Sequence, residues 1–230
     1  MARPTPMQRL ARWHIWLGWL VGVPLLLWTL SGLVMVARPI EEVRGQHLRI
    51  APPAGAMTVE FGGDGAAIKL SEGRLIQQRG RAILLATLPD GTVARYDLTK
   101  PEAGPLPPVD EAEAREAVAS GIVGGRQVVS THLFPADQAP LDFRRPLAAW
   151  QVVLADGTHV YVGQASGEIE AVRTRWWRTF DFMWGLHIMD LETREDTHHP
   201  LLTGFAALAL IACLIGTVLL LRRRRRPISR

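Results

Sequence analysis

Two long apolar runs stand near the ends of the chain, and between them apolar and polar residues alternate over shorter distances. The runs, Ile15–Ala37 and Leu201–Leu221, contain no charged residue. About 20 such residues are enough for an α-helix to cross a hydrocarbon core. The first run is longer than the core of a secretory signal peptide, and no small-residue cleavage motif follows it. The pattern therefore predicts two retained transmembrane helices that flank a central domain.

The central domain carries two copies of a hairpin signal. Leu88-Pro-Asp-Gly-Thr92 recurs as Leu154-Ala-Asp-Gly-Thr158, and in both copies Asp-Gly lies between runs of β-branched and apolar residues. Asp-Gly in this setting is a strong indication of a β-hairpin. The flanking runs predict strands over 82–88 and 92–96 in the first copy, and over 149–154 and 158–162 in the second.

A helix is expected before the second hairpin, over residues 109–119. Asp110 is suited to cap its N-terminus, and Ala112, Val118 and Ala119 give it an apolar face. The first copy shows no comparably clear helix. The two copies therefore read as a degenerate tandem of helix-plus-sheet modules, separated by the proline-rich stretch Pro101–Pro108.

A second amphipathic helix is expected just before the second apolar run. Seven residues at helical spacing form one apolar stripe that suits the membrane interface. They are Trp176, Phe180, Met183, Trp184, His187, Ile188 and Leu191. An acidic turn follows, and His198-His199 then precede Pro200, where the second transmembrane helix is expected to begin.

Charge is divided sharply between the ends and the centre. All 22 acidic residues lie between the two apolar runs, whereas outside them the sequence has nine arginines and no acid. Such an excess of Lys and Arg marks cytoplasmic flanks. We therefore expect a bacterial inner-membrane protein with both termini cytoplasmic and a periplasmic central domain. The Arg222–Arg226 run is typical of contact with anionic lipid, and no nucleic-acid partner is expected.

These elements predict a membrane α+β protein with seven segments. They are a cytoplasmic N-terminus (1–14), a first transmembrane helix (15–37), a β-rich periplasmic half (38–108), a second periplasmic half (109–174), an interfacial helix with an acidic turn (175–199), a second transmembrane helix (200–221) and a basic cytoplasmic tail (222–230). The single cysteine, Cys213, lies within the second apolar run, so the central domain has no disulfide.

Three stretches carry a resemblance to a known family. They are Arg12-Trp13-His14-x-Trp16-Leu17-Gly18 with the later Ser31-Gly32, the run Trp150–Ile169, and the run Phe182–Asp190 with Pro200-Leu201-Leu202. In this order they resemble the PepSY-associated transmembrane proteins, and the central domain resembles a PepSY domain with an antiparallel sheet. Larger relatives with four spans include haem-binding ferric-siderophore reductases. This chain has two spans, so a complete two-haem core is not expected within one subunit.

His14 is the candidate ligand of an inner haem. Gly18 and Gly22 follow it on the same helical face, where a backbone or a flat porphyrin can approach closely. Two alternatives remain: His14 contacts only water or phosphate at the interface, and Gly18 and Gly22 form a helix-packing motif with the second span or between two copies. If His14 binds haem, one protomer offers one inner histidine, and a bis-His site then needs His14 from two subunits.

His187, His198 and His199 are the candidates for an outer haem. His187 lies on the apolar stripe, and the His198–His199 pair stands at the mouth of the second span, so two of them could fill both axial positions. The alternative is that His187 only packs at the interface and the pair belongs to the loop. The nearby carboxylates match no zinc motif, and no catalytic or separate metal site is predicted. For His47, His132 and His159 a solvated or strand-face role is expected.

Two functions are consistent with these features. The first is a haem b electron-transfer or accessory subunit of periplasmic iron reduction or uptake. The second is a non-catalytic PepSY module, anchored in the lipid bilayer, that binds and regulates a periplasmic partner such as a peptidase. A homodimer through the transmembrane helices suits the first function. The residues decide neither whether the protein is an enzyme nor what it acts on.

Overall fold

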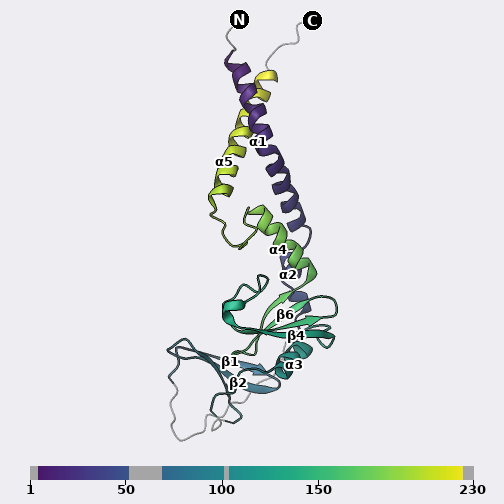
Figure 1. Cartoon of the computed structure of the whole chain (residues 1–230), viewed down its shortest axis with the longest axis vertical. Helices are drawn as coiled ribbons and strands as arrows, with labels where there is room; N and C mark the ends of the chain where they lie inside the picture. The colour runs from purple at the N-terminus through teal and green to yellow at the C-terminus, as the bar shows by residue number, and fades with distance from the viewer. Residues whose placement is uncertain (1–4, 52–68, 101–103, 225–230) are drawn as a thin grey trace. The chain divides into compact units, whose positions relative to one another are not determined.

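The computed structural model describes residues 5–51, 69–100 and 104–224, and they fall into two compact units (Figure 1). Unit 1 comprises Met1–Pro39 and Thr179–Arg230, and unit 2 comprises Ile40–Arg178. Unit 1 contains the long apolar helices, and unit 2 contains the sheets. The boundary falls within helix α4 (Arg175–His187).

Helix α1 (Pro6–Met35) begins well before the apolar run that predicts it. Thr5 caps its N-terminus: the Thr5 hydroxyl accepts from the Gln8 backbone N–H, and the Gln8 side chain accepts from the Thr5 N–H. Pro6 follows as the first helical residue, where its missing N–H costs nothing. The helix is thus defined by its cap and not by the point where apolar residues start.

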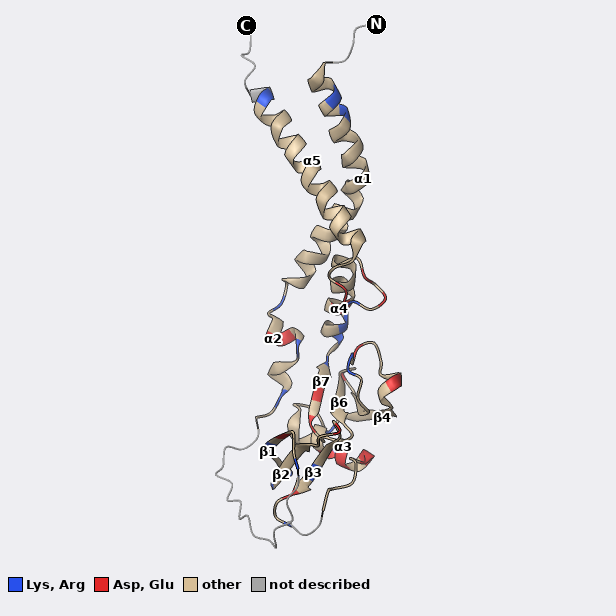
Figure 2. Cartoon of the chain, turned by 90° about the vertical axis from the view of Figure 1, so that its left-hand side faces the viewer, with Lys and Arg blue, Asp and Glu red and all other residues tan. Residues whose placement is uncertain are grey.

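Helix α5 (Pro200–Arg224) begins at the predicted proline and packs against α1. The contact buries Val21 of α1 against Phe205, Ala209 and Ala212 of α5. Small residues permit close approach where lipid gives no hydrophobic drive for association. Both helices are long and apolar enough to cross a membrane, with mean hydropathies of 1.8 and 2.6. Figure 2 shows Lys and Arg on them only toward the chain ends.

Helix α4 ends at His187, so the predicted continuation of its apolar stripe to Leu191 is wrong. Met189 adopts a left-handed conformation with φ of 59°. The Asp190 N–H then bonds to the Gly185 carbonyl at 2.9 Å, and the Met189 N–H bonds to the Leu186 carbonyl at 3.3 Å. These two bonds form a Schellman motif, which stops the helix by satisfying its last carbonyls.

The second half of unit 2 is one helix on an antiparallel sheet. Helix α3 (Glu111–Gly121) is capped by Asp110, whose carboxylate accepts from the Glu113 N–H at 2.7 Å. The sheet has the order β4-β5-β6-β7. Its strands are β4 (Val128–Phe134), β5 (Ala149–Leu154), β6 (His159–Gly163) and β7 (Ile169–Arg173). The predicted helix, its cap and the second hairpin are confirmed.

The core of this half lies between α3 and the sheet. Val118 of α3 is fully buried with Val152, Val160 and Val172 of the sheet. The predicted apolar face of the helix is partly wrong, because Ala112 is exposed. The buried alanine is Ala114, one turn before Val118.

The first half of unit 2 is a three-stranded antiparallel sheet of order β1-β2-β3. Its strands are β1 (Glu72–Gln78), β2 (Arg81–Thr87) and β3 (Val93–Asp97), and the first predicted hairpin is therefore confirmed. Short elements precede it: α2 (Ile40–Val43) and the 3₁₀ helix η1 (Gln46–Leu48). A further 3₁₀ turn, η3 (Ala136–Gln138), follows β4. Residues 52–68 and 101–103, the latter within the predicted linker, lie outside the described residues.

The two Asp-Gly turns have the same construction. In each, the glycine has a positive φ, 83° at Gly91 and 80° at Gly157, which glycine adopts at little cost. Asp90 and Asp156 each accept a hydrogen bond from the backbone N–H two residues later, at 2.9 and 2.8 Å. Equivalent turns in equivalent hairpins support the tandem interpretation of the two halves. Together with the apolar helices, they confirm the predicted α+β fold class.

Candidate functional site

In unit 1, His187 at the end of α4 packs against α1. Its ring stacks on Trp28 with a centroid separation of 5.1 Å. On α1, a Cβ atom placed on Gly32 would lie 3.3 Å from Cε1 of His187, so the glycine leaves room for the imidazole. Ser31, which is fully buried, lies beside the same ring. The predicted outer histidine is therefore half-buried in a defined orientation.

The hydrogen bonds of His187 favour one of its two neutral tautomers. Nδ1 lies 3.0 Å from Ser31 Oγ and 3.2 Å from the Trp28 carbonyl oxygen. Ser31 donates its own hydroxyl proton to that carbonyl at 2.9 Å. Because a carbonyl only accepts, we assign the proton of neutral His187 to Nδ1 and the lone pair to Nε2. A histidine that donates one ring N–H to a carbonyl and presents the other nitrogen has the arrangement of a metal ligand.

His198 and His199 are engaged locally in the loop before α5. Nδ1 of His199 accepts from the Leu201 N–H at 3.3 Å and so helps to cap α5. His198 is exposed and lies beside Thr197. Among the described residues, no hydrogen bond or ring contact joins either histidine to His187. The structure thus brings His187 together with Trp28, Ser31 and Gly32 of α1.

The acidic turn between His187 and His198 is organised by Asp190. Its carboxylate accepts backbone N–H groups from Glu192, Thr193, Glu195 and Asp196. Hydrogen bonds, led by the Thr193 hydroxyl, hold the pKa of Asp190 well below its ordinary value. Among the described residues no group of three or more His, Cys, Asp or Glu side chains could hold a metal ion. The carboxylate therefore serves the loop itself.

A second contact ties this turn back to α4. Arg194 donates to the buried carboxylate of Asp181 at 2.6 Å, and its backbone carbonyl accepts from Trp184 Nε1 at 3.0 Å. A Cβ atom on Gly185 would come within 2.8 Å of the Arg194 side chain. The end of α4, and with it His187, is therefore fixed from the loop as well as from α1.

His14, the predicted inner histidine, is a residue of α1, and its side chain packs against α5. A Cβ atom on Gly216 of α5 would come within 2.8 Å of Cε1 and 3.3 Å of Nε2 of His14. Its Nδ1 is buried and has no hydrogen-bond partner among the described residues. A buried ring nitrogen without a hydrogen bond lowers the stability of the fold. Its presence therefore favours a role for His14 other than packing, such as ligand binding.

Gly18 and Gly22 lie on a different face of α1 from the one that packs on α5. A Cβ atom at either position would meet nothing within 4 Å. They instead line an open groove of about 470 Å³ together with Trp19, Val23 and Leu26. The predicted contact with the second span is thus not formed, and contact between two copies stays a prediction.

The histidines of unit 2 have surface or structural roles. His159 Nδ1 donates to Asp142 Oδ2 at 3.0 Å, and Tyr161 donates to the other carboxylate oxygen at 2.6 Å. Burial raises the pKa of Asp142, but the hydrogen bonds from His159 and Tyr161 outweigh it, so this pKa lies below its ordinary value. His47 and His132 are exposed.

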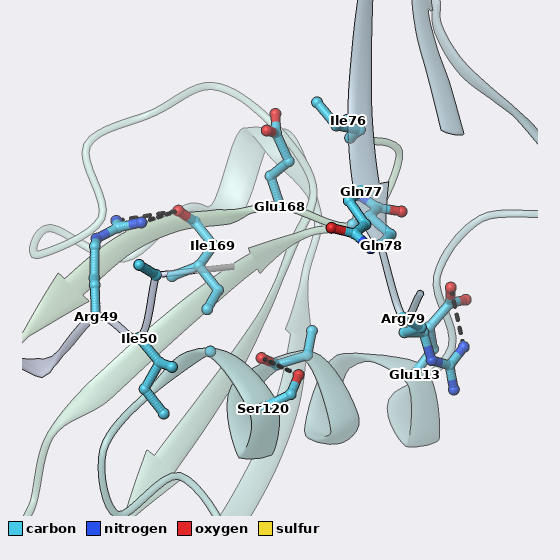
Figure 3. Close-up of a pocket in the computed structure, with 14 residues that line it drawn as sticks. Arg49, Ile50, Ile76, Gln77, Gln78, Arg79, Glu113, Ser120, Glu168 and Ile169 are labelled. Carbon is cyan, nitrogen blue, oxygen red and sulfur yellow. Dashed lines mark hydrogen bonds and ion pairs between the residues drawn. The ribbon is translucent and has the colours of Figure 1, made fainter. Parts of the chain in front are cut away.

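Unit 2 contains a cavity of about 480 Å³ that the sequence did not reveal (Figure 3). Its walls come from four parts of the chain: the segment Arg49–Ala51, the end of β1 with its turn at Ile76–Arg79, one side of α3, and the β6–β7 connection at Gly167–Ile169. The residues of α3 that line it are Glu113, Ala117, Ser120 and Gly121. These elements are far apart in sequence and converge only in the fold. No local motif marks such a cavity.

The charged groups around the cavity are already paired. Both terminal nitrogens of the Arg49 guanidinium donate hydrogen bonds to the Ile169 carbonyl oxygen, each at 3.1 Å. Glu113 forms ion pairs with Arg79 at 3.3 Å and with Arg95 at 2.8 Å. Glu168 is bonded to Arg74. What remains for a ligand is mainly amide, hydroxyl and aliphatic surface.

Trp28, Ser31 and Gly216 were not identified as site residues from the sequence. Ser31 and Gly32 carry a signal, since they are a small polar pair within an apolar run. Gly216 could have been found by continuing the small-residue spacing of Ala209 and Ala212 along α5.

Comparison with known proteins gives one family. The family model described as PepSY-associated TM region matches residues 11–230. Neither the curated proteins nor the solved structures contain a match. Because the family model covers both apolar helices and the two sheets, the chain belongs to the PepSY-associated transmembrane family.

Proposed function

We propose that this membrane protein is a haem b electron-transfer subunit of a system that reduces or takes up iron, with His187 and His14 as axial ligands. The observation that carries the proposal is the state of His187. Its Nδ1 lies 3.2 Å from the Trp28 carbonyl oxygen, a contact that favours a proton on Nδ1 and leaves the lone pair on Nε2. An imidazole that only packs has no need of a buried serine and a carbonyl to select its tautomer.

The two histidines suit the two sides of a bilayer. His14 lies in the first half of α1, and His187 contacts the helix around Trp28. At 1.5 Å per residue, about 21 Å of helix separates these two levels. Bound haem would supply a one-electron carrier at each level. The residues of the chain fix the ligand orientation and exclude water from the apolar helix pair.

The proposal requires two copies of the chain. Each protomer offers one oriented histidine at each level, whereas a six-coordinate bis-His haem needs two. His14 from two subunits would then meet at the inner level. His198 and His199 remain as alternative second ligands at the outer level, although both are engaged in the loop. The arginine-rich flanks favour a cytoplasmic inner level and a periplasmic outer level.

The test is the absorbance of the full chain purified from haem-replete cells. We expect a Soret band and a low-spin reduced spectrum. His187→Gln, which keeps a side chain of similar size, should lose part of the haem, and the exposed control His132→Gln should lose none. A colourless wild-type protein refutes the proposal.

A second variant tests the tautomer argument itself. Ser31→Ala removes one acceptor from Nδ1–H and should keep the haem but raise its reduction potential, because the imidazole becomes a weaker electron donor. An unchanged potential would show that Ser31 does not act on the ligand.

If the protein is colourless, the second candidate function takes its place: a non-catalytic, membrane-anchored module that binds a periplasmic partner. The cavity of unit 2 favours it, because the cavity is large enough for a ligand and its charged wall groups are already paired.

A further inference from the structure

The cavity of unit 2 adjoins a strand edge that has no partner among the described residues. Strand β1 pairs with β2 alone, in the three-stranded sheet. The cavity touches the last three residues of this strand, Ile76–Gln78, and then Arg79 of the turn that follows. Side chains alternate between the two faces of a strand. A cavity on one face would meet every second residue, so contact with a continuous run places it along the edge.

The hairpin turn determines which main-chain groups that edge presents. Arg79 and Gly80 both have positive φ, 54° and 74°, as a two-residue type I′ turn requires. The flanking residues Gln78 and Arg81 are then a hydrogen-bonded pair across the hairpin. Because bonded and outward residues alternate in an antiparallel pair, Gln77 and Leu75 direct their N–H and C=O groups away from β2.

This edge lacks one of the usual protections against pairing. The register of β1 with β2 is regular from Glu72 to Gln78. The equivalent outer strand of the second sheet, β4, has a register shift between Val128 and Ser130. Bulges of this kind discourage a further strand from pairing at an edge. Within one chain, the tandem copies therefore differ at the edge that borders the cavity.

We propose that β1 and the cavity bind an extended, uncharged segment of a partner protein as an additional strand. The outward N–H and C=O groups of Gln77 and Leu75 would bond to the peptide backbone, and an aliphatic side chain would enter between Ile50, Ile76 and Ile169. Glu113 and Glu168 are held in ion pairs and the Arg49 guanidinium is bound to the Ile169 carbonyl, so each of the three already has a partner other than a ligand. The site lies within unit 2, so the inference is independent of haem binding and gives the second candidate function its ligand class.

The experiment selects short random peptides against the full-length protein in lipid nanodiscs. Enriched peptides should have an uncharged, β-branched centre, and salt should barely change their affinity. N-methylation of the central amides should weaken binding at every second position only, because one edge of the peptide strand bonds to β1. Loss of one to two such bonds weakens binding about tenfold or more.

Two variants of the protein test the same strand pairing by changing β1 and the cavity instead of the peptide. Gln77→Pro removes an outward N–H that β2 does not use, so the sheet should persist while the peptide affinity falls by about tenfold or more. Ser120→Trp fills the cavity, and Arg115→Trp on another side of α3 is its control. Circular dichroism and the thermal melting of each variant report on folding separately.

Three results would overturn the inference. One is enrichment of charged peptides with strongly salt-dependent binding, and another is no enrichment at all. The third is an efficient disulfide between cysteines placed at Met57 and Gln77. Residues 52–68 follow Ala51 in the chain, and such a crosslink would show that this segment occupies the edge.

Discussion

Replacing Glu113 with glutamine tests how the two halves of unit 2 are joined. Arg95 on β3 of the first half has a side chain that is only 2% exposed, and it meets Glu113 on α3 of the second half. Its guanidinium also donates to the Pro107 carbonyl at 2.8 Å and to Gln78 at 3.3 Å. Glu113→Gln keeps the size of the side chain and removes the only anion paired with this buried cation among the described residues.

The expected costs of the two single variants are unequal. Breaking a buried ion pair from one side costs about 3–5 kcal/mol, because an uncompensated charge is left behind. Glu113 is 23% exposed and water reaches it, so we expect about 2–3 kcal/mol for Glu113→Gln. Arg95→Met instead removes the buried charge and fills the space with an apolar chain. The Glu113 left behind keeps Arg79 at 3.3 Å, so the cost should be about 1 kcal/mol.

The assay is urea unfolding of the protein in detergent micelles, with hydrogen exchange of β1–β3 and α3 to confine the effect to unit 2. The double variant should be about as stable as Arg95→Met alone. Once Arg95 is methionine, no buried cation is present to lose its counterion when Glu113 becomes glutamine. This gives a coupling energy of about 2 kcal/mol. The reasoning is refuted if Arg95→Met destabilises unit 2 more than Glu113→Gln does.

Three further predictions concern other parts of the molecule. Gly216→Val places carbon within 2.8 Å of Cε1 of His14, so the steric overlap should lower the melting temperature, as calorimetry measures, and should deplete the haem proposed at His14, as absorbance measures. Gly18→Leu with Gly22→Leu should leave the α1–α5 packing intact and abolish self-association, as light scattering measures; a dimer that persists argues against this face. The folded-state pKa of Asp142 lies below its ordinary value, so its stabilisation is complete above about pH 4 and is lost as the pH falls through the lowered pKa. Asp142→Asn should flatten this acid limb of the melting temperature, and an unchanged limb would contradict it.

Elements with a local cause were predictable from the sequence. The cap at Asp110, the helix start at Pro200 and the two Asp-Gly turns each depend on a few adjacent residues. Their strands follow because alternation and turn chemistry agree. The two hairpins and their sheets could therefore be inferred before any coordinates, although the bounds of individual strands moved by a residue.

Features with a distant cause were not predictable. The apolar stripe of α4 continues to Leu191, but the helix stops earlier because Met189 turns and Arg194 bonds back to Asp181. On α3, alanines surround the helix, so composition alone could not tell that Ala114 is buried and Ala112 exposed. In both cases the deciding contact comes from another element and leaves no periodic signal.

The small residues of the two apolar helices show what this difference means for assembly. Gly18-x-x-x-Gly22 is the motif that a sequence search finds first, yet the contact within the chain uses Ala209, Ala212 and Gly216 of α5. The small-residue face of α5 is thus covered by α1, whereas the glycine face of α1 remains open along a groove. The unoccupied glycine face offers the close approach of backbones that a contact between two copies of the chain requires, so the Gly18→Leu, Gly22→Leu variant should lose dimerisation while the α1–α5 contact persists.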